Sequence, residues 1–490
     1  MKKKLGKNPL FYLLLCLIFS SLFLMYQIIK LGIIPFKFLM IIGCSILVIL
    51  SILGFLLLKS YKHLISLIVS IVLSILICFS TIFGNVYINM VYSSLNKIVQ
   101  EEKYVKKTTH IYVLKTNPIE TIQDLNNHKV GMMENLENNE GSVGINKKLN
   151  EENVFIKYKK YKSALEMLED FKNGEISGIL CDSAFLSTMA GTKNGKGLKE
   201  KVKSIISYEY MIEKSKANKD KVEIAVNPFN IYVSGVDTTG EIQESSRSDV
   251  NMIVSVNPNT RQILLTSIPR DYYVETCCDA EDGCAIGEYD KLTHTGLHGP
   301  DTTEKTLENL FGIKINYNVR VNFSSVVDIV DELGGITVNN PREFNMRNYH
   351  FDAGEIHLNG KEALAFCRER KSFESGDRER GKNQMRVMKG LINKVLSPKI
   401  LTNFSGILKA VSNSFTTNMP LEDITQLINK QLNDGGDWEI YSYSVDGTTG
   451  MDFAYELGDY ASVMYPDEET IEKAVENIVS IENGQEPVHK

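Results

Sequence analysis

Three long apolar stretches open the chain, and the pattern of polar positions changes abruptly after about residue 90. Residues 9–29, 38–58 and 64–84 contain no charged side chain, and each stretch is long enough to cross about 30 Å of hydrocarbon. A cleaved signal peptide has a single, shorter apolar region followed by small residues. The pattern therefore predicts a membrane anchor of three transmembrane helices within residues 1–90.

Basic residues around these stretches predict their orientation. Lysines crowd the segment before the first stretch, and Lys59 and Lys62 lie between the second and the third. The loop between the first two stretches contains only Lys30 and Lys37. Because cytoplasmic loops collect positive charge, we expect a cytoplasmic N-terminus in a multi-pass cell-membrane protein, with everything after about residue 90 on the extracytoplasmic side.

Residues 105–215 alternate short apolar runs with a helical pattern. The runs predict strands at 111–115, 129–134, 154–158 and 176–182, and Ala164, Leu168 and Phe171 share one face of a helix between them. Such alternation is typical of a small α/β unit with a parallel sheet. The polar, glycine-rich segment 193–200 predicts an exposed loop. We interpret this region as an accessory domain whose ligand the sequence does not reveal.

A second α/β domain is predicted over residues 221–485, after a lysine-rich linker. Strands are expected at 230–236, 250–256 and 262–268, and helices at 303–312, 324–335 and 380–395. Mixed strands flanked by helices predict a three-layer α/β/α sandwich. On the last helix, the pattern predicts an inner face with Met385, Met388, Leu391, Ile392 and Val395, and another side with Arg380, Asn383 and Gln384.

Arginine is confined to a short part of the chain. Only eleven of the 54 basic residues are arginine, and all eleven lie between Arg247 and Arg386. Residues 221–490 contain 25 basic and 42 acidic residues, a balance of −17, so these arginines lie in an acidic domain. A nucleic-acid binder presents a broadly basic face. Because a guanidinium matches phosphate or carboxylate as a planar fork, the confinement indicates a local anion site; codon bias with a few structural ion pairs is the alternative.

The cysteines divide into three kinds. Cys16, Cys44 and Cys78 lie in the apolar stretches, and Cys181 and Cys367 are expected as buried thiols. Cys277, Cys278 and Cys284 are close together, but the spacing to His294 and His298 matches no familiar zinc site. Outside the cytoplasm, a loop disulfide from Cys284 to Cys277 or Cys278 is the better interpretation.

Charged residues at the ends of the predicted strands are the candidate catalytic and ligand-binding residues. Asp237 follows the first strand, Arg247 and Asp249 precede the second, and Arg270 and Asp271 follow the third. Polar groups on loops held by a rigid sheet are a usual place for active sites. Two converging aspartates would suit Mg²⁺, and arginines would neutralise phosphate oxygens. Each aspartate taken alone could equally be a turn or cap residue.

Several segments together resemble the LytR-CpsA-Psr family over residues 226–400. They include SRSDVNMIVSVNPNTRQILLTSIPRDYYV, DKLTHTG, HLNGKEALAFCRERKS and GDRERGKNQ, in the family's order. The three spans and the intervening α/β region are similar to the capsule-associated CpsA branch. The resemblance implies transfer of a glycopolymer, such as a capsule polysaccharide or teichoic acid, from a polyprenyl diphosphate carrier to peptidoglycan.

The resemblance also implies roles for individual residues. It assigns Asp237 and Asp249 to a divalent metal, Mg²⁺ with Mn²⁺ as a second candidate. It assigns the diphosphate to Arg247, Arg270, Arg368, Arg370, Arg380 and Gln384. Asn383 and Thr239 occupy positions where other members have arginine. Arg261, Arg320, Arg342 and Arg347 match no motif and are interpreted as structural.

The predicted mechanism is direct transfer, because the chain offers no Ser–His or Cys–His pair for a covalent intermediate. Arg270, Arg368 and Arg370 would act at the diphosphate, and Asp249 or Asp271 would deprotonate the acceptor, a peptidoglycan sugar hydroxyl. Expected partners are the lipid-linked glycopolymer, peptidoglycan, the membrane and a capsule or polymer export machinery, without nucleic acid. One rival is a non-catalytic receptor for anionic polymer; a transcriptional regulator is opposed by the topology and the acidic balance.

Overall fold

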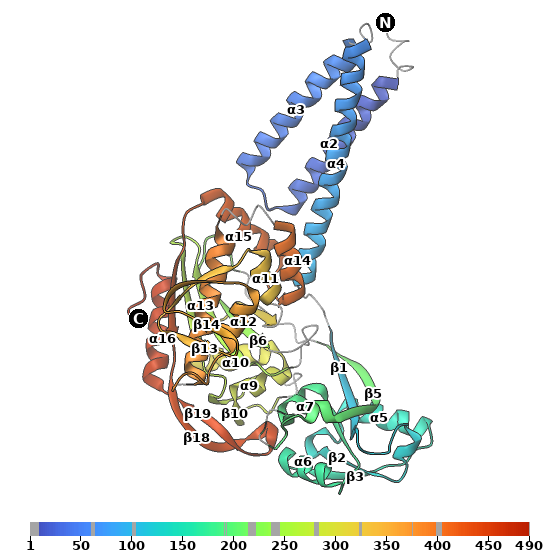
Figure 1. Cartoon of the computed structure of the whole chain (residues 1–490), viewed down its shortest axis with the longest axis vertical. Coiled ribbons are helices and arrows are strands. Elements are labelled where there is room, and N and C mark those ends of the chain that lie inside the picture. Colours follow the sequence, from blue (N-terminus) through green and yellow to red (C-terminus); the bar gives the residue numbers. More distant parts are fainter. Residues whose placement is uncertain are drawn as a thin grey trace.

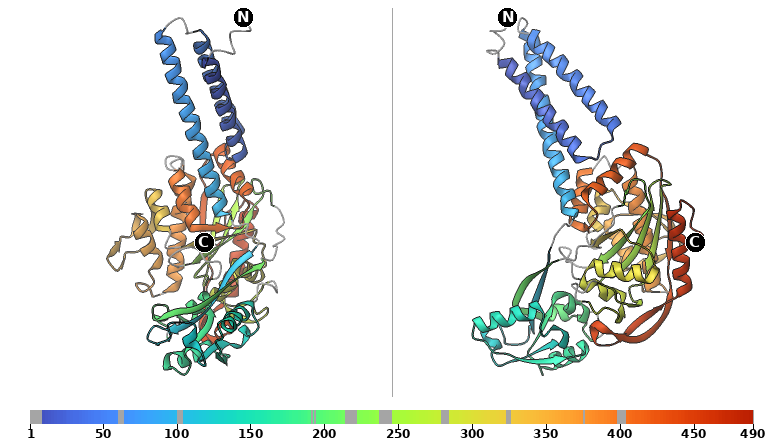
Figure 2. Two further views of the ribbon diagram at one scale, coloured as in Figure 1. Left: turned by 90° about the vertical axis from the view of Figure 1, so that its right-hand side faces the viewer. Right: turned by 180° about the vertical axis from the view of Figure 1, so that it is seen from behind.

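The computed structural model of the protein describes residues 9–59, 64–99, 104–190, 192, 194–213, 222–236, 246–278, 284–322, 326–374, 376–397 and 404–489. Three long helices extend from one end of the molecule (Figures 1 and 2). A six-stranded sheet with helices on both faces forms the middle, and a smaller five-stranded sheet lies at the end opposite the long helices. The predicted class, α/β with three N-terminal apolar helices, is confirmed.

The three helices are α2 (Pro9–Leu31), α3 (Phe36–Lys59) and α4 (Leu64–Ile98). All three are long and apolar enough to cross a membrane. The third predicted stretch, 64–84, was too short, because α4 continues for four more turns to Ile98. Those turns keep apolar residues at helical spacing, and Val91, Leu95 and Ile98 are buried against the body. The extension was missed because its apolar stripe is interrupted by polar residues.

The anchor is packed against the body instead of being joined by a flexible tether. Leu95 of α4 lies in one apolar cluster with Leu408 of α14 (Phe404–Ser414) and side chains of α15 (Leu421–Asp434). The start of α3 contacts α15 as well, since Lys37 Nζ donates to the carbonyl of Asn433 at 2.6 Å. These contacts fix the direction of the three helices relative to the body.

The smaller sheet belongs to the predicted accessory region, and we call this part the accessory unit. Its strand order is β3-β2-β4-β1-β5. The strands are β1 (Tyr104–Leu114), β2 (Lys129–Met133), β3 (Lys157–Tyr161), β4 (Gly178–Asp182) and β5 (Val202–Glu213). Helix α5 (Glu140–Glu151) packs on one face, and α6 (Ala164–Asn173) and α7 (Ser183–Ala190) on the other.

Three predictions for the accessory unit were wrong in detail. Its sheet is mixed, since β1 runs antiparallel to both β4 and β5. The strand expected at 154–158 lies at Lys157–Tyr161, where polar KYKKY forms the edge strand next to β2. Strand β5 was not predicted, and the loop expected at 193–200 ends in the short helix α8 (Leu198–Lys201). The linker expected after Glu213 lies outside the described residues.

The central sheet has the order β16-β11-β6-β7-β8-β17. Its strands are β6 (Phe229–Val236), β7 (Val250–Asn257), β8 (Gln262–Ile268), β11 (Tyr317–Asn322), β16 (Phe415–Thr417) and β17 (Glu439–Ser444). Every residue of β7 and β8 is buried, because helices cover both faces, and this explains their nearly continuous apolar sequence. The three predicted strands 230–236, 250–256 and 262–268 are confirmed to within a residue.

Side chains alternate between two cores on either side of this sheet. Val254 and Leu265 face a core built with α11 (Val326–Glu332), α12 (Gly360–Arg368) and α13 (Asp377–Leu396). Ile253 and Leu264 face the opposite core, with α10 (Pro300–Phe311) and α16 (Glu468–Glu482). The three-layer α/β/α prediction is therefore confirmed. Two details of α13 were wrong: Val395 is 38 % exposed, and Asn383 is fully buried.

Short elements complete the accessory unit and the central body. They are η2 (Gln123–Leu125), η3 (Glu134–Leu136), β9 (Tyr273–Glu275), β10 (Tyr289–Lys291), α9 (Leu292–Thr295), η5 (Gly296–His298), β12 (Ile336–Asn340), β13 (Phe344–Met346), β14 (Tyr349–Phe351), β15 (Gly354–Leu358) and η8 (Tyr455–Leu457). Cys278 and Cys284 form a disulfide, one of the two predicted pairings, and Cys277 is free. Cys181 and Cys367 are buried as expected.

A long hairpin joins the central body to the accessory unit. Strands β18 (Gly447–Ala454) and β19 (Asp459–Pro466) reach away from the sheet (Figure 1). Ala454 and Leu457, at its tip, are buried in the apolar core of the accessory unit. Ser163 donates a hydrogen bond to Asp459 Oδ2 at 3.0 Å across the same contact. The two units are thus packed together at this point.

Candidate active site

The candidate site lies where several strand ends meet the start of a helix. Strand β7 begins and its antiparallel neighbour β8 ends at one edge of the central sheet. Strand β17 runs parallel to β8 and ends at this same edge. Helix α13 crosses there closely, since a Cβ on Gly381 would lie 2.9 Å from Ser267 Oγ. A cavity of about 260 Å³ is enclosed between these elements.

The cavity is lined by an excess of positive charge. Arg270, Arg378, Arg380 and Lys382 face it together with the carboxylates of Asp249 and Asp446. Among the described residues, four cations against two anions leave a net positive lining, which suits an anionic ligand. Gln384 also lines the cavity, one turn of α13 beyond Arg380, and its amide can donate hydrogen bonds to the same ligand.

Arg270 and Asp249 are joined across the strand ends. Arg270 Nη1 lies 2.9 Å from Asp249 Oδ1, and both side chains are less than one quarter exposed. The backbone positions Asp249, because its N–H donates to the carbonyl of Gly235 at 3.0 Å. The buried guanidinium of Arg320 donates to the carbonyl of Ser246 at 2.8 Å and so fixes the start of the same segment. Arg320 acts as a structural residue, in agreement with its interpretation from the sequence.

Asp271 faces a different pair of cations. It forms an ion pair with Lys291, and its Oδ2 lies 3.8 Å from Arg270 Nε. Burial disfavours the charged carboxylate, but the charges of Lys291 and Arg270 together outweigh burial and hold the pKa of Asp271 below its ordinary value. A carboxyl group with a lowered pKa is a weaker base. Asp271 is therefore less suited than predicted to accept a proton from a hydroxyl group.

The structure brings together some of the predicted site residues. Asp249, Arg270, Arg380 and Gln384 line one cavity. Asp237 and Thr239 lie outside the described residues. Asn383, in contrast with the prediction, is fully buried beside this helix face, where its Oδ1 accepts from Arg386 Nη1 at 2.5 Å.

Three predicted arginines are not among the residues that line the cavity. Arg368 and Arg370 are exposed near the end of α12, and Arg247 is partly exposed beside Asp249. Arg247 also lies near the accessory unit: the pKa of Lys199 in α8 is lowered, first by burial and then by the charge of Arg247. These three roles stay predictions.

The sequence had not indicated Arg378 or Asp446. Arg378 Nε lies 2.6 Å from Asp446 Oδ1, and the same guanidinium donates to the carbonyl of Gly447. Arg378 belongs to the GDRER segment, so its proximity to Arg380 was the available signal. Asp446 follows β17, a strand that had not been predicted, so only the tertiary fold brings it to this edge.

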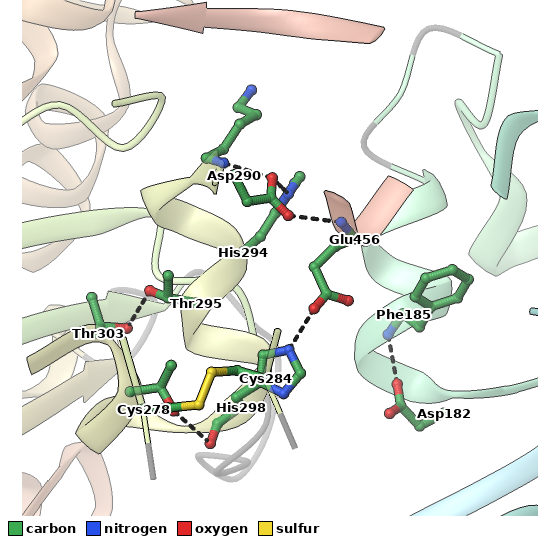
Figure 3. A network of polar contacts seen from close by, with 12 residues as sticks. Asp182, Phe185, Cys278, Cys284, Asp290, His294, Thr295, His298, Thr303 and Glu456 are labelled. Atoms are coloured by element: carbon green, nitrogen blue, oxygen red, sulfur yellow. Dashed lines mark hydrogen bonds and ion pairs between the residues drawn. A yellow bond between two sulfur atoms is a disulfide. The ribbon is translucent and has the colours of Figure 1, made fainter. Parts of the chain in front are cut away.

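The DKLTHTG segment forms a second polar network, shown in Figure 3. His294 Nδ1 lies 2.7 Å from Asp290 Oδ1, and Asp290 Oδ2 accepts from the backbone N–H of Glu456 at 2.8 Å. His298 Nε2 lies 2.6 Å from Glu456 Oε1. Because Glu456 belongs to the hairpin tip, this network fastens the hairpin to the body next to the accessory unit.

The comparisons with known proteins decide the family. The model of the LytR_cpsA_psr family matches residues 198–477 of this chain. The chain belongs to the LytR_cpsA_psr family. It is 35% identical over 261 residues to a Bacillus licheniformis protein, covering 50% of this chain and 82% of that protein. A Bacillus subtilis (strain 168) protein is 37% identical over 225 residues, covering 45% and 70% of the two chains.

Both of these family members are named polyisoprenyl-teichoic acid–peptidoglycan teichoic acid transferase TagU. The crystal structure of B. subtilis TagU is 32% identical and has a TM-score of 0.40, covering 53% of this chain and 97% of that chain. The resemblance to the LytR-CpsA-Psr family found in the sequence is confirmed. The narrower assignment to the CpsA branch stays a prediction.

Proposed function

We propose that this protein transfers a glycopolymer from a polyprenyl diphosphate carrier to a sugar hydroxyl of peptidoglycan. The observation that carries the proposal is the cationic cavity beside Asp249, in a member of a family whose relatives are named as teichoic acid transferases. A diphosphate is a compact anion that guanidinium groups bind through paired hydrogen bonds. The cavity therefore suits the diphosphate part of the donor.

Each of the cavity residues has its own role in the proposed reaction. Arg270, Arg378 and Arg380 hold the diphosphate oxygens, and Gln384 donates to the same group. The acceptor hydroxyl attacks the phosphorus attached to the glycopolymer, and a new P–O bond forms. The phosphoanhydride P–O bond breaks, and polyprenyl phosphate leaves with the electron pair. Arginines fixed before the reaction stabilise the charge that develops on these oxygens.

Asp249 is the better candidate for the proton acceptor. It lines the cavity, whereas Asp271 is held by Lys291 and has a lowered pKa. Arg270 orients the Asp249 carboxylate at 2.9 Å, as the base of a general acid–base step requires. With Arg270 at the diphosphate and in contact with Asp249, the proposed donor and the proposed base would lie next to each other.

A divalent cation, Mg²⁺ or Mn²⁺, is part of the proposal. Asp249 supplies one carboxylate of the oxygen type that Mg²⁺ prefers, and Asp237, outside the described residues, would supply the second. Within the described ranges, no group of three His, Cys, Asp or Glu side chains is arranged to hold a metal ion. Asp249 and Asp237 would hold the cation, which would need further oxygen ligands beyond these two carboxylates. When bound, the cation would neutralise charge on the diphosphate.

The membrane anchor is consistent with a lipid-linked donor. Three apolar helices anchor the chain, and their lysine pattern supports the proposed orientation with the body outside the membrane. A protease added to intact cells would cleave the body if this orientation is correct. Protection of the body in intact cells, and its cleavage only after lysis, would contradict the orientation.

A transfer assay tests the function. The full-length protein in nanodiscs would receive a synthetic polyprenyl-diphosphate-linked oligosaccharide with Mg²⁺, and release of polyprenyl monophosphate would be followed with and without peptidoglycan. Asp249→Asn should abolish release but retain donor binding. Arg342→Lys is the matched control, because Arg342 lies over the Phe373 ring and pairs with Glu379, away from the cavity lining.

The receptor rival makes a different prediction for this assay. A receptor binds the donor but releases no polyprenyl phosphate under any divalent cation or acceptor. Removing the negative charge of Asp249 would then leave binding unchanged or tighter. If the wild-type protein binds the donor but releases no polyprenyl phosphate, the receptor hypothesis would therefore replace the transferase hypothesis.

A further inference from the structure

The hairpin β18–β19 has one packed face and one open face. Cross-strand partners in its antiparallel register place Asp452, Ala454 and Val463 on one face. This face rests on the body and the accessory unit: Ala454 and Val463 are buried, and the ring of Tyr273 in β9 meets the Tyr465 ring edge to face, with centroids 6.0 Å apart. The opposite face contains the pairs Thr449–Met464, Met451–Ser462 and Phe453–Tyr460.

Large apolar side chains are exposed along the open face. Met451 is 61 %, Phe453 42 % and Tyr460 64 % exposed. The Phe453 and Tyr460 rings meet edge to face, with centroids 6.1 Å apart, so the two rings point their flat surfaces in different directions. Thr449 and Ser462 are exposed between these apolar groups and supply hydroxyls that can donate or accept hydrogen bonds.

The open face leads toward the candidate active site along β19. Met464 points to the same side of the hairpin as Tyr460 and Ser462, but it is buried (7 % exposed) and lines the cavity. From Met464 to Tyr460 the strand covers about 13 Å, at roughly 3.3 Å per residue. This length would accommodate several sugar rings. The open face ends at the hairpin tip, which is packed in the accessory unit. One end of the open face is therefore directed to the cavity, and the other end lies at a rigid support.

We propose that this open face, Thr449, Met451, Phe453, Tyr460 and Ser462, binds the sugar rings of the acceptor peptidoglycan strand and leads its hydroxyl to the cavity. Aromatic rings with a polar neighbourhood stack on the C–H faces of pyranoses and leave the sugar hydroxyls to the adjacent Thr and Ser. The inference rests on the proposed transferase function and names the surface that presents its acceptor.

Charge favours the acceptor strand over the donor polymer. Residues 447–466 contain Asp452, Glu456 and Asp459 and no lysine or arginine. Asp452 lies on the packed face, and Glu456 and Asp459 contact His298 and Ser163 at the tip, so the open face has no charged side chain. The hairpin therefore offers no cation to a polymer with a phosphate in every repeat, while the cationic cavity next to it would attract the diphosphate. The site thus separates the anionic donor from the sugar-rich acceptor along one hairpin.

Binding experiments with the full-length protein in nanodiscs test this surface. The probes are uncrosslinked peptidoglycan glycan strands and poly(glycerol phosphate), each without donor. The double variant Phe453→Ala/Tyr460→Ala should raise the Kd for glycan strands about tenfold or more, while Phe453→Trp/Tyr460→Trp keeps it near the wild-type value. Phe155→Ala, which removes a 65 % exposed ring from the accessory unit, is the matched control and should change nothing.

Each outcome decides the inference. Wild-type glycan affinity in the double alanine variant would overturn it, as would a loss of poly(glycerol phosphate) binding alone, which would assign the face to the donor. If the double variant does not fold, Tyr460→Ala, which removes the most exposed ring, gives the same comparison. Because no donor is present, the result is independent of whether the protein releases polyprenyl phosphate, and that release tests the proposed function separately.

Discussion

Arg270 Nη1 and Asp249 Oδ1 lie 2.9 Å apart, although 21 residues separate them in the sequence. Asp249 immediately precedes β7 and Arg270 lies just after β8, so the antiparallel pairing of the two strands brings them together. The pair fixes a cation and a carboxylate side by side at the cavity. An arginine in this place both orients Asp249 and offers further N–H groups to a ligand.

Replacing Arg270 with lysine should lower kcat/KM for transfer by about 10- to 100-fold, because an ammonium group is a point charge and cannot reproduce the planar fork. Initial rates of polyprenyl phosphate release over a range of donor concentrations would measure the loss. Arg342→Lys, the same change away from the cavity, should retain the wild-type rate. Equal rates for both variants would remove Arg270 from the proposed mechanism.

Single substitutions of Arg378 and Asp446 test whether the charge of the cavity lining controls donor affinity. Their side chains are 40% and 48% exposed, so the ion pair should contribute no more than about 1 kcal/mol to folding. Arg378→Ala and Asp446→Asn should therefore lower the Tm by similar small amounts. Donor affinity should fall in Arg378→Ala and rise or stay unchanged in Asp446→Asn, because only the first removes a cation from the cavity. Isothermal titration with a non-reactive diphosphate lipid would measure both; parallel losses of affinity would contradict the electrostatic role.

Acid should destabilise the network around Asp290. Burial opposes ionisation of Asp290, but His294 and two backbone N–H groups outweigh burial and keep its pKa below the ordinary value. A lowered folded-state pKa contributes stability that is present above the unfolded pKa of about 3.9 and is lost as the pH falls through the folded value. Wild-type stability should thus fall progressively below about pH 5.

Asp290→Asn should lower stability at pH 7 by about 1–3 kcal/mol, since it weakens buried hydrogen bonds, and should flatten this acid dependence. Thermal unfolding between pH 7 and about pH 2 measures both effects. Asp328→Asn, on the exposed side of α11, is the control. An unchanged acid dependence in Asp290→Asn would show that other groups control acid unfolding.

The parts of the fold that were predicted from the sequence are those with a clear local pattern of apolar residues. Strands β7 and β8 were predicted because burial of both faces leaves them nearly all apolar. Strand β3, with the sequence KYKKY, has no such pattern and was placed three residues early. Its position depends on parallel pairing with β2, which local sequence does not encode.

The candidate site was predicted to the extent that its residues belong to recognisable segments. Asp249, Arg270, Arg380 and Gln384 were predicted and share one cavity. Asp446 and Met464 were missed because they come from the C-terminal part of the chain, where the hairpin folds back onto the strand ends. The ion pair of Lys291 with Asp271 was missed for a related reason, since β9 and β10 must pair to bring them together. Long-range pairing, not residue type, limited the prediction.

The contact between the hairpin tip and the accessory unit can be broken by one methyl group. Gly458 has φ +58°, and a Cβ there would lie 1.7 Å from the carbonyl oxygen of Lys162. Gly435 has φ +61° with nothing within 4 Å of its Cβ position. Alanine costs about 1–2 kcal/mol of backbone strain in the left-handed conformation of Gly458, and more at Gly435, whose ψ of −158° essentially only glycine adopts. Only Gly458→Ala also excludes the tip from the accessory unit.

Gly458→Ala should therefore expose Leu457 and abolish the contact between Ser163 and Asp459, whereas Gly435→Ala should lower stability without separating the two units. Hydrogen exchange would measure this as faster exchange in residues 454–461 and in α6 of the first variant only. If the tip also supports the open face of the hairpin, glycan binding should weaken in Gly458→Ala and stay unchanged in Gly435→Ala. Identical exchange in both variants would show that the tip contact does not hold the units together.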